Sequence, residues 1–449
     1  MHKFMMVASL SLLLAGALSA AAAATIQLKD GRNEKAFDIQ AETVSGIIWE
    51  SERGRPGTRI KLWDLNDVSY AGSTMDQFNG LSRKLQGGRG AKLRSDAQQI
   101  KNGEVPSGFS NDQWSRLELS LDYFIAMADY LEGDWQAAVS GLEDYIKASE
   151  GQTYSDNVVR ASFKSEVSGK QVATAGGLNR YYLDALEALG LAYLKQGDAA
   201  QANKKAFTPL QNLTEQLASN SGDSEYFDWG IRALRASADY AQTQDDFKGA
   251  RESYDALARV ALKKNAGRPS RTSYEAQLKV GFMQIKEKDT RGAASRFYEA
   301  VRAWENDHKA ADRPWQPSNN WIDPDTAYLT AGSYLGQGLV EAAEASRAED
   351  WGEALTAFST SLSIFNADDE IRSMAMLGAA NAAAQLAELN KDNLRKDKDG
   401  EMVPVTSDNY ARLAEKYLSE LTTLLPKSKA AEDDSIQDIQ ALINKHRRD

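Results

Sequence analysis

A segment that reads as helix, turn and helix recurs along this 449-residue chain. Its clearest copy runs from Leu186 to Phe207, with Gly197 and Asp198 at the turn and Ala202 on the second helix. Four further copies carry an aspartate at the turn: Asp134, Asp246, Asp289 and Asp350. A single unit of this size cannot bury its own apolar face, so the repetition predicts helix pairs that stack on one another.

The residue types within each copy have physical reasons. Small residues such as Gly190 and Gly281 on the first helix let two helices approach closely, and an aromatic residue such as Phe297 or Phe358 on the second helix reaches toward the next unit. The turn aspartates can accept hydrogen bonds from free amides at the start of the second helix. Asp198 with Gln201, and Asp350 with Glu353, have the spacing of a capping box.

These copies resemble the tetratricopeptide repeat. The resemblance implies a mainly α fold, an antiparallel helix-pair solenoid, in which the first helices line a groove that holds a partner protein. It places the following residues in that groove: Tyr123, Met127, Tyr130, Asp184, Glu187, Lys195, Arg232, Arg235, Asp239 and Gln242. Two features depart from the family: the turn aspartates lie further apart than its period of about 34 residues, and most copies lack its terminal proline.

The segment 25–70 differs from the rest of the chain. Its residues alternate with period two and include Ile47, Trp49, Ile60 and Val68, which favour strands, with a reversal at Asp30-Gly31. We expect a small SH3-like β segment there, followed by tetratricopeptide-like repeats over 71–305 and again over 326–449.

The first 24 residues have the pattern of a secretory signal peptide. Lys3 precedes an apolar run, and small residues end at Ala24, where cleavage is expected. An uncleaved membrane anchor is the alternative, since the run is nearly long enough to span. No later segment is apolar enough to span, and the chain has no cysteine for a disulfide or lipid attachment. The sequence therefore predicts a bacterial periplasmic or secreted protein.

Three stretches interrupt the helical pattern. The segment 151–179 is rich in Ser and Gly, and 391–407 is a charged loop. The segment 306–325 contains three prolines together with Trp315 and Trp321, so it cannot be helical throughout. The two tryptophans either pin this loop onto the helices or form a second contact surface.

The sequence offers little for catalysis or metal binding. Beyond the signal peptide only His308 and His446 remain, which excludes the common zinc motifs, and no G-x-S-x-G motif is present. Adjacent acidic residues fall at helix ends, where capping explains them. A calcium loop starting at Arg395 fails, because that position and Thr406 carry no carboxylate. We expect no catalytic residue, metal or cofactor.

Taken together, the residues predict a scaffold or adaptor that holds other envelope proteins. The net charge of −11, one unit more negative without Lys3, disfavours nucleic acid as a partner. Two alternatives stay open: an enzyme or accessory acting on cell-wall glycan, and a helical periplasmic protein that binds a small ligand.

Overall fold

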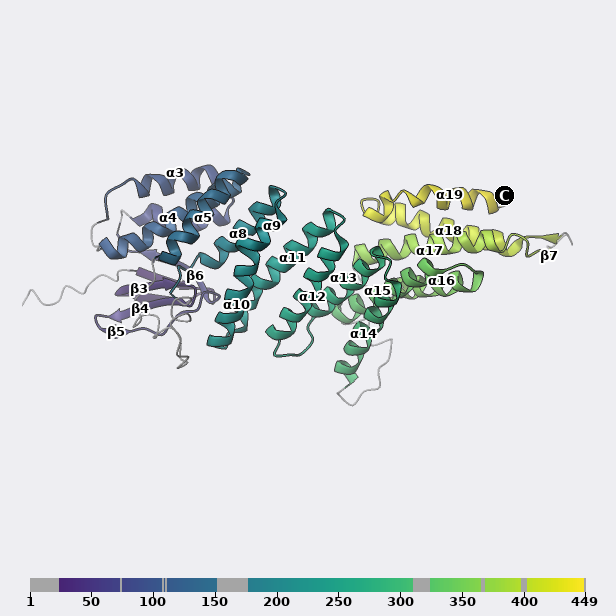
Figure 1. Cartoon of the computed structure of the whole chain (residues 1–449), viewed down its shortest axis with the longest axis horizontal. Helices are drawn as coiled ribbons and strands as arrows, with labels where there is room; N and C mark the ends of the chain where they lie inside the picture. The colour runs from purple at the N-terminus through teal and green to yellow at the C-terminus, as the bar shows by residue number, and fades with distance from the viewer. Residues whose placement is uncertain are drawn as a thin grey trace, which may run out of the picture. The chain divides into compact units, whose positions relative to one another are not determined.

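The protein is mainly helical, with a small β segment before the helices (Figure 1). The computed structural model describes residues 24–72, 75–106, 109, 111–151, 177–309, 324–364, 368–396 and 402–447. The chain forms two compact units, Met1–Ala233 and Leu234–Asp449, so that the boundary falls within helix α11 (Phe227–Thr243).

The β segment contains two antiparallel three-stranded sheets, as the period-two pattern predicts in outline. Their orders are β2-β1-β6 and β3-β4-β5. The strands are β1 (Ala24–Leu28), β2 (Asn33–Ala36), β3 (Asp38–Thr43), β4 (Gly46–Glu52), β5 (Arg55–Pro56) and β6 (Leu65–Tyr70). Gly31 turns the chain with a φ of 88°, which favours glycine. Ile26, Ile47 and Val68 are buried and form part of the core.

Helices make up most of the described part of the first unit. They are α1 (Asp76–Asn79), α2 (Leu81–Gln86), α3 (Gly90–Lys101), α4 (Asn111–Leu131), α5 (Trp135–Gly151), α8 (Tyr182–Lys195), α9 (Ala199–Gln201), the π-helical η2 (Ala202–Phe207), α10 (Thr208–Ser221) and the 3₁₀ turn η3 (Ser224–Tyr226). α9, η2 and α10 follow without a break. Pro209 lies in the first turn of α10, directly after the π-helical η2.

The second unit is also helical. It contains α12 (Phe247–Lys264), α13 (Arg271–Lys286), α14 (Thr290–Lys309), α15 (Pro324–Glu344), α16 (Ala348–Ser363), α17 (Asp369–Leu389), the short strands β7 (Arg395–Lys396) and β8 (Met402–Val403), α18 (Val405–Leu424), the 3₁₀ turn η5 (Lys429–Glu432) and α19 (Ser435–His446). From α12 to α18 each helix packs on the next, and α15 also contacts α13 and α17.

Glycines and aromatic rings interlock between these helices, as the sequence predicts. A Cβ on Gly190 would lie 2.1 Å from the ring of Phe207, so only glycine fits there. Phe297 of α14 touches Gly281 of α13 and Gly336 of the following helix α15. Phe358 of α16 lies in the same way between glycines of α15 and α17. Phe297 and Phe358 therefore each pack between two neighbouring helices of the second unit.

The predicted helix caps are correct at four of the five turns. The carboxylates of Asp134, Asp198, Asp246 and Asp289 each accept a hydrogen bond of 2.9 to 3.1 Å from the amide three residues later. The prediction for Asp350 is wrong, because α16 already begins at Ala348 and Asp350 lies in its first turn. The Asp350 carboxylate instead accepts from the backbone amide of Arg347, at 3.0 Å.

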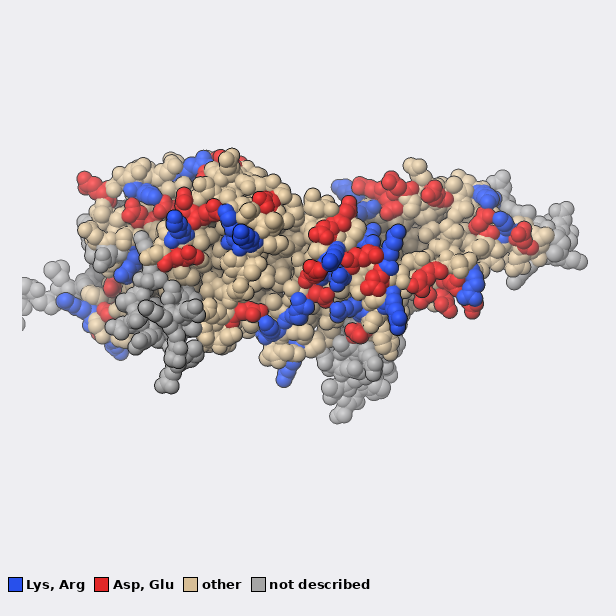
Figure 2. Space-filling view, in the orientation of Figure 1, with Lys and Arg blue, Asp and Glu red and all other residues tan. Residues whose placement is uncertain are grey.

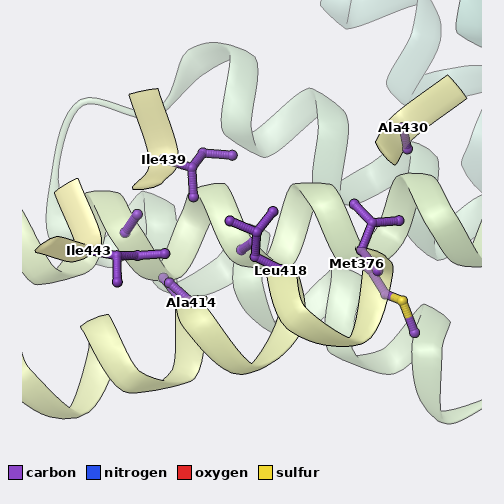
Figure 3. Close-up of a cluster of buried hydrophobic side chains, with 10 residues drawn as sticks. Met376, Ala414, Leu418, Ala430, Ile439 and Ile443 are labelled. Carbon is purple, nitrogen blue, oxygen red and sulfur yellow. The ribbon is translucent and has the colours of Figure 1, made fainter. Parts of the chain in front are cut away.

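The C-terminal helices have a core of their own. Ile439 and Ile443 of α19 point toward Leu418 and Ala414 of α18, and all four are buried (Figure 3).

In the segment between α17 and α18, β7 pairs with β8, and α18 begins at Val405. The predicted charged loop 391–407 therefore ends earlier than expected, because its last residues form the first turn of a helix.

Several predictions fall on residues outside the described chain. The signal peptide lies there except for Ala24, which begins β1. Most of the stretches 151–179 and 306–325, including Trp315 and Trp321, lie there as well. Among the helices that are described, none combines the length and apolarity needed to cross a membrane.

Candidate functional site

One predicted groove residue from each of α4, α8 and α11 lines a single pocket in the first unit. We call it the Trp229 pocket, and its volume is about 440 Å³. Its wall includes Tyr123, Asp184 and Arg232, three residues that the sequence places in a groove. The remaining wall comes from the β segment, α2, the two residues before α8 and the residues around η3: Lys29, Leu62, Trp63, Leu65, Asn66, Asp67, Ser82, Leu85, Gln86, Arg180, Tyr181, Glu225, Asp228 and Trp229.

A buried ion pair fixes the side of this pocket next to the β segment. Arg180 precedes α8, and its Nε lies 2.9 Å from Oε2 of Glu42 on β3; each side chain is 8% exposed. The backbone amide of Arg180 also donates to the Glu42 carbonyl. Burial alone would lower the pKa of Arg180, but the adjacent Glu42 carboxylate holds it above its usual value. The guanidinium therefore stays charged and joins β3 to α8.

Tyr123 is part of the pocket wall. Its ring stacks on that of Tyr181, with centroids 4.5 Å apart and planes 9° from parallel. Because Tyr123 is only 3% exposed, a partner lying over α4 would meet little of its side chain. Burial raises the pKa of its hydroxyl well above the usual value, so the group stays neutral. We assign Tyr123 to the support of the pocket.

Asp184 and Trp229 connect α8 with α11 inside the pocket. The indole Nε1 of Trp229 donates a 2.8 Å hydrogen bond to Oδ1 of Asp184. Burial raises the pKa of the Asp184 carboxyl, with a smaller contribution from the nearby charge of Glu187. This carboxylate therefore lies in a setting that disfavours its negative charge.

Arg232 and Glu187 form a second link between the same helices. The guanidinium donates to both carboxylate oxygens of Glu187, with the shortest bond at 2.6 Å. It also lies over the ring of Trp229, 5.2 Å from the centroid. Two predicted groove residues thus bind each other, and this arrangement orients the indole.

Other predicted residues surround this group less closely. Tyr130 is half-buried with its ring edge-on to Trp135, and burial together with the charge of Glu187 raises its pKa. Met127 is half-buried, and Lys195 is exposed in the last turn of α8. These three side chains are available at or near the surface of the first unit.

Three predicted residues of α11 belong to the second unit. Arg235 lies 3.8 Å from the carboxylate of Glu275 on α13. Asp239 accepts a 2.7 Å hydrogen bond from the hydroxyl of Tyr254 on α12, and Gln242 is half-buried. The predicted set is thus divided between the two units.

The second unit carries a separate groove of about 830 Å³ among α14, α15, α16, α17 and α18. Tyr298, which is 60% exposed, lies along it together with Glu341 and Glu353. Burial and the repulsion of neighbouring glutamates raise the pKa of Glu341. Figure 2 shows acidic side chains gathered over α16, beside this groove.

The sequence analysis missed Arg180, Tyr181, Trp229, Asp67 and Trp63. Arg180 and Tyr181 lie at the end of the predicted Ser- and Gly-rich stretch, and Trp63 and Asp67 lie in the β segment. Nothing in the periodicity connects these segments. The segment Glu225–Arg232, which reads EYFDWGIR, offered the one local signal, because it places an indole one turn before a groove arginine.

Neither protein-family models nor curated proteins match this chain. Among the described residues, no three His, Cys, Asp or Glu side chains are grouped in a way that could hold a metal ion. The Trp229 pocket is lined by aromatic rings, by carboxylates and by two guanidinium groups, each of which already faces a carboxylate.

Proposed function

We propose that this chain is an exported scaffold that holds a partner protein through a tetratricopeptide-like array of helix pairs. The observation that carries the proposal is the convergence of Tyr123, Asp184 and Arg232, from three different helices, on the wall of one pocket. Arginine is a favoured anchor at protein interfaces, and the side chain of Arg232 is about half exposed. The pocket also has a size typical of binding sites, which range from about 300 to 1,000 Å³.

The packing supports the repeat part of this proposal. Phe297 and Phe358 each touch glycines of two flanking helices, which is the contact expected between neighbouring pairs of a stacked array. The contacts of α15 with both α13 and α17 point the same way. In such an array the first helices line up, and their side chains form one continuous recognition face.

The test is capture of a partner from an envelope extract of the source organism by the chain from Thr25 onward. A face variant, Lys195→Glu with Arg232→Ala, changes exposed residues on first helices. A matched control, Lys204→Glu with Arg259→Ala, changes exposed residues on second helices. We expect the control to retain a defined protein and the face variant to bind it at least tenfold more weakly, with both variants folded by circular dichroism.

Equal capture by both variants would contradict the proposal, because it would place the contact away from the first helices. If no protein is captured even by the unchanged chain, the scaffold proposal fails and a small ligand becomes the better candidate. Purified partner and titration calorimetry then give the affinity difference directly.

A further inference from the structure

We infer that the Trp229 pocket binds a positively charged side chain, arginine or lysine, with the carboxylates of Asp67 and Asp184 as its counter-charges. The inference rests on the proposed function, in which a segment of the partner protein supplies this side chain. It concerns a pocket that the β segment helps to build, and therefore a site different from a groove made by helices alone.

The first reason is the charge of the pocket wall. Its two arginines are already engaged with acids that lie outside the wall: Arg180 with Glu42, and Arg232 with Glu187. The wall itself contains four acidic residues, and Lys29 is its remaining basic residue. The wall therefore has an excess of negative charge that a bound cation would neutralise.

The second reason is the state of two of these acids. Within the described part of the chain, the carboxylates of Asp67 and Asp184 accept hydrogen bonds from neutral N–H groups, the Val68 amide and the Trp229 indole, but form no ion pair. Burial raises the pKa of both. Partly desolvated carboxylates without an ion-pair partner gain the most from an incoming guanidinium or ammonium group.

The third reason is the aromatic part of the wall. Trp63 and Trp229 offer flat apolar surface for the methylene stem of a long basic side chain. Rings in this wall already accept cations: Arg180 lies 4.5 Å from the centroid of Tyr181, and Arg232 lies 5.2 Å from that of Trp229. A phosphate or carboxylate ligand would meet repulsion from these two aspartates, whereas a neutral sugar would add no positive charge to that of the nearby arginines.

The experiment uses the indole N–H of Trp229 as its reporter, because this group donates directly to Asp184. The chain is labelled with ¹⁵N-tryptophan, and its Trp229→Phe variant assigns the resonance. The probes are the capped peptide acetyl-Gly-Gly-Arg-Gly-Gly-amide, the same peptide with neutral citrulline in place of arginine, and a chito-oligosaccharide. Capping removes the terminal charges, so only the side chain differs between the peptides.

We expect the arginine peptide to shift the Trp229 resonance with a saturable dependence on concentration. The citrulline peptide should bind about tenfold to a hundredfold more weakly, the range for loss of a charge-assisted hydrogen bond. Asp67→Asn with Asp184→Asn should weaken the arginine peptide by a similar factor, because asparagine keeps the shape and an acceptor oxygen but not the charge. The exposed Asp369→Asn in the second unit serves as the control and should change nothing.

Equal shifts with the arginine and citrulline peptides would overturn the inference, and so would a shift with the oligosaccharide alone, which would make the pocket a glycan site. Absence of any shift would overturn it too, provided that the amide spectrum shows a folded chain. These failures differ from failure of the scaffold proposal, since the unchanged chain would still capture a partner protein if the pocket ignored the peptide.

Discussion

Arg180 and Glu42 provide the sharpest test of how the first unit is held together. Replacing Arg180 by methionine removes the guanidinium but keeps a long apolar stem, so it leaves the Glu42 carboxylate buried without its ion-pair partner. Glu42→Gln does the converse, leaving a buried cation beside a neutral amide. Both side chains are 8% exposed, so water cannot fully replace the lost partner.

The magnitude follows from the geometry. At the observed N–O separation of 2.9 Å, and with an effective dielectric constant of about 20, the two charges attract by roughly 6 kcal/mol. Desolvation of both groups offsets much of this attraction. Removing one partner of a buried pair typically costs about 3 to 5 kcal/mol, because the remaining charge is still desolvated. We expect that loss for each single variant.

Hydrogen exchange read by mass spectrometry is the suitable assay, because two units need not unfold together. Peptides covering β3 and α8 should lose about 3 to 5 kcal/mol in their free energy of opening, while peptides from α17 in the second unit should be unchanged. The double variant Arg180→Met with Glu42→Gln should cost at least about 2 kcal/mol less than the sum of the two single variants. If the loss in the double variant equals the sum of the two single losses to within about 0.5 kcal/mol, the two side chains do not interact energetically, and the idea that their ion pair holds β3 to α8 is refuted.

Four further changes test the packing, the caps and the surface charges. Gly190→Ala should destabilise the first unit by about 1 to 3 kcal/mol in chemical denaturation, because the added Cβ would lie 2.1 Å from the ring of Phe207. Gly352→Ala, where an added Cβ meets no atom within 4 Å, should instead stabilise α16 by about 0.5 to 1 kcal/mol. A larger loss of stability at Gly352 than at Gly190 would contradict the close packing of glycines against aromatic rings. Asp246→Ala should cost about 1 kcal/mol through loss of the cap of α12, and an unchanged denaturation midpoint would show that solvent caps the helix equally well. The pKa of Glu388 is lowered from 4.5 to about 2 by hydrogen bonds from two lysines and a histidine, so the ionised carboxylate stabilises the fold above about pH 4.5, and this contribution is lost as the pH falls through 2. Glu388→Gln should therefore flatten the pH dependence of the melting temperature between these two pH values. The same pH dependence in the variant and the unchanged chain would argue against the lowered pKa.

The sequence by itself determined the local features of this protein. Asp198 and Asp246 cap their helices as predicted because the amide that each binds lies three residues away, within reach whatever the rest of the chain does. The sequence likewise indicates that position 190 needs a small residue, because the next helix carries an aromatic residue that packs toward it. Asp350 was misjudged because its preceding residues, including Arg347, can also start a helix, and the sequence does not decide between two nearby start points.

The candidate site was only partly predictable for a related reason. The resemblance to tetratricopeptide repeats placed Asp184 and Arg232 in one groove, and both side chains do line the same pocket. It could not show that Tyr123 would be covered by Tyr181, because that depends on the conformation of a stretch outside the repeat.

Only the tertiary structure brought Arg180 to Glu42 and placed Trp63 and Asp67 in the same pocket wall as Trp229. These residues come from segments with different periodicities, and no local hydrogen bond relates them. Their proximity depends on how the β segment packs on the helices, which is decided by burial over the whole unit. The charge, the aromatic surface and therefore the ligand preference of the pocket are products of that packing.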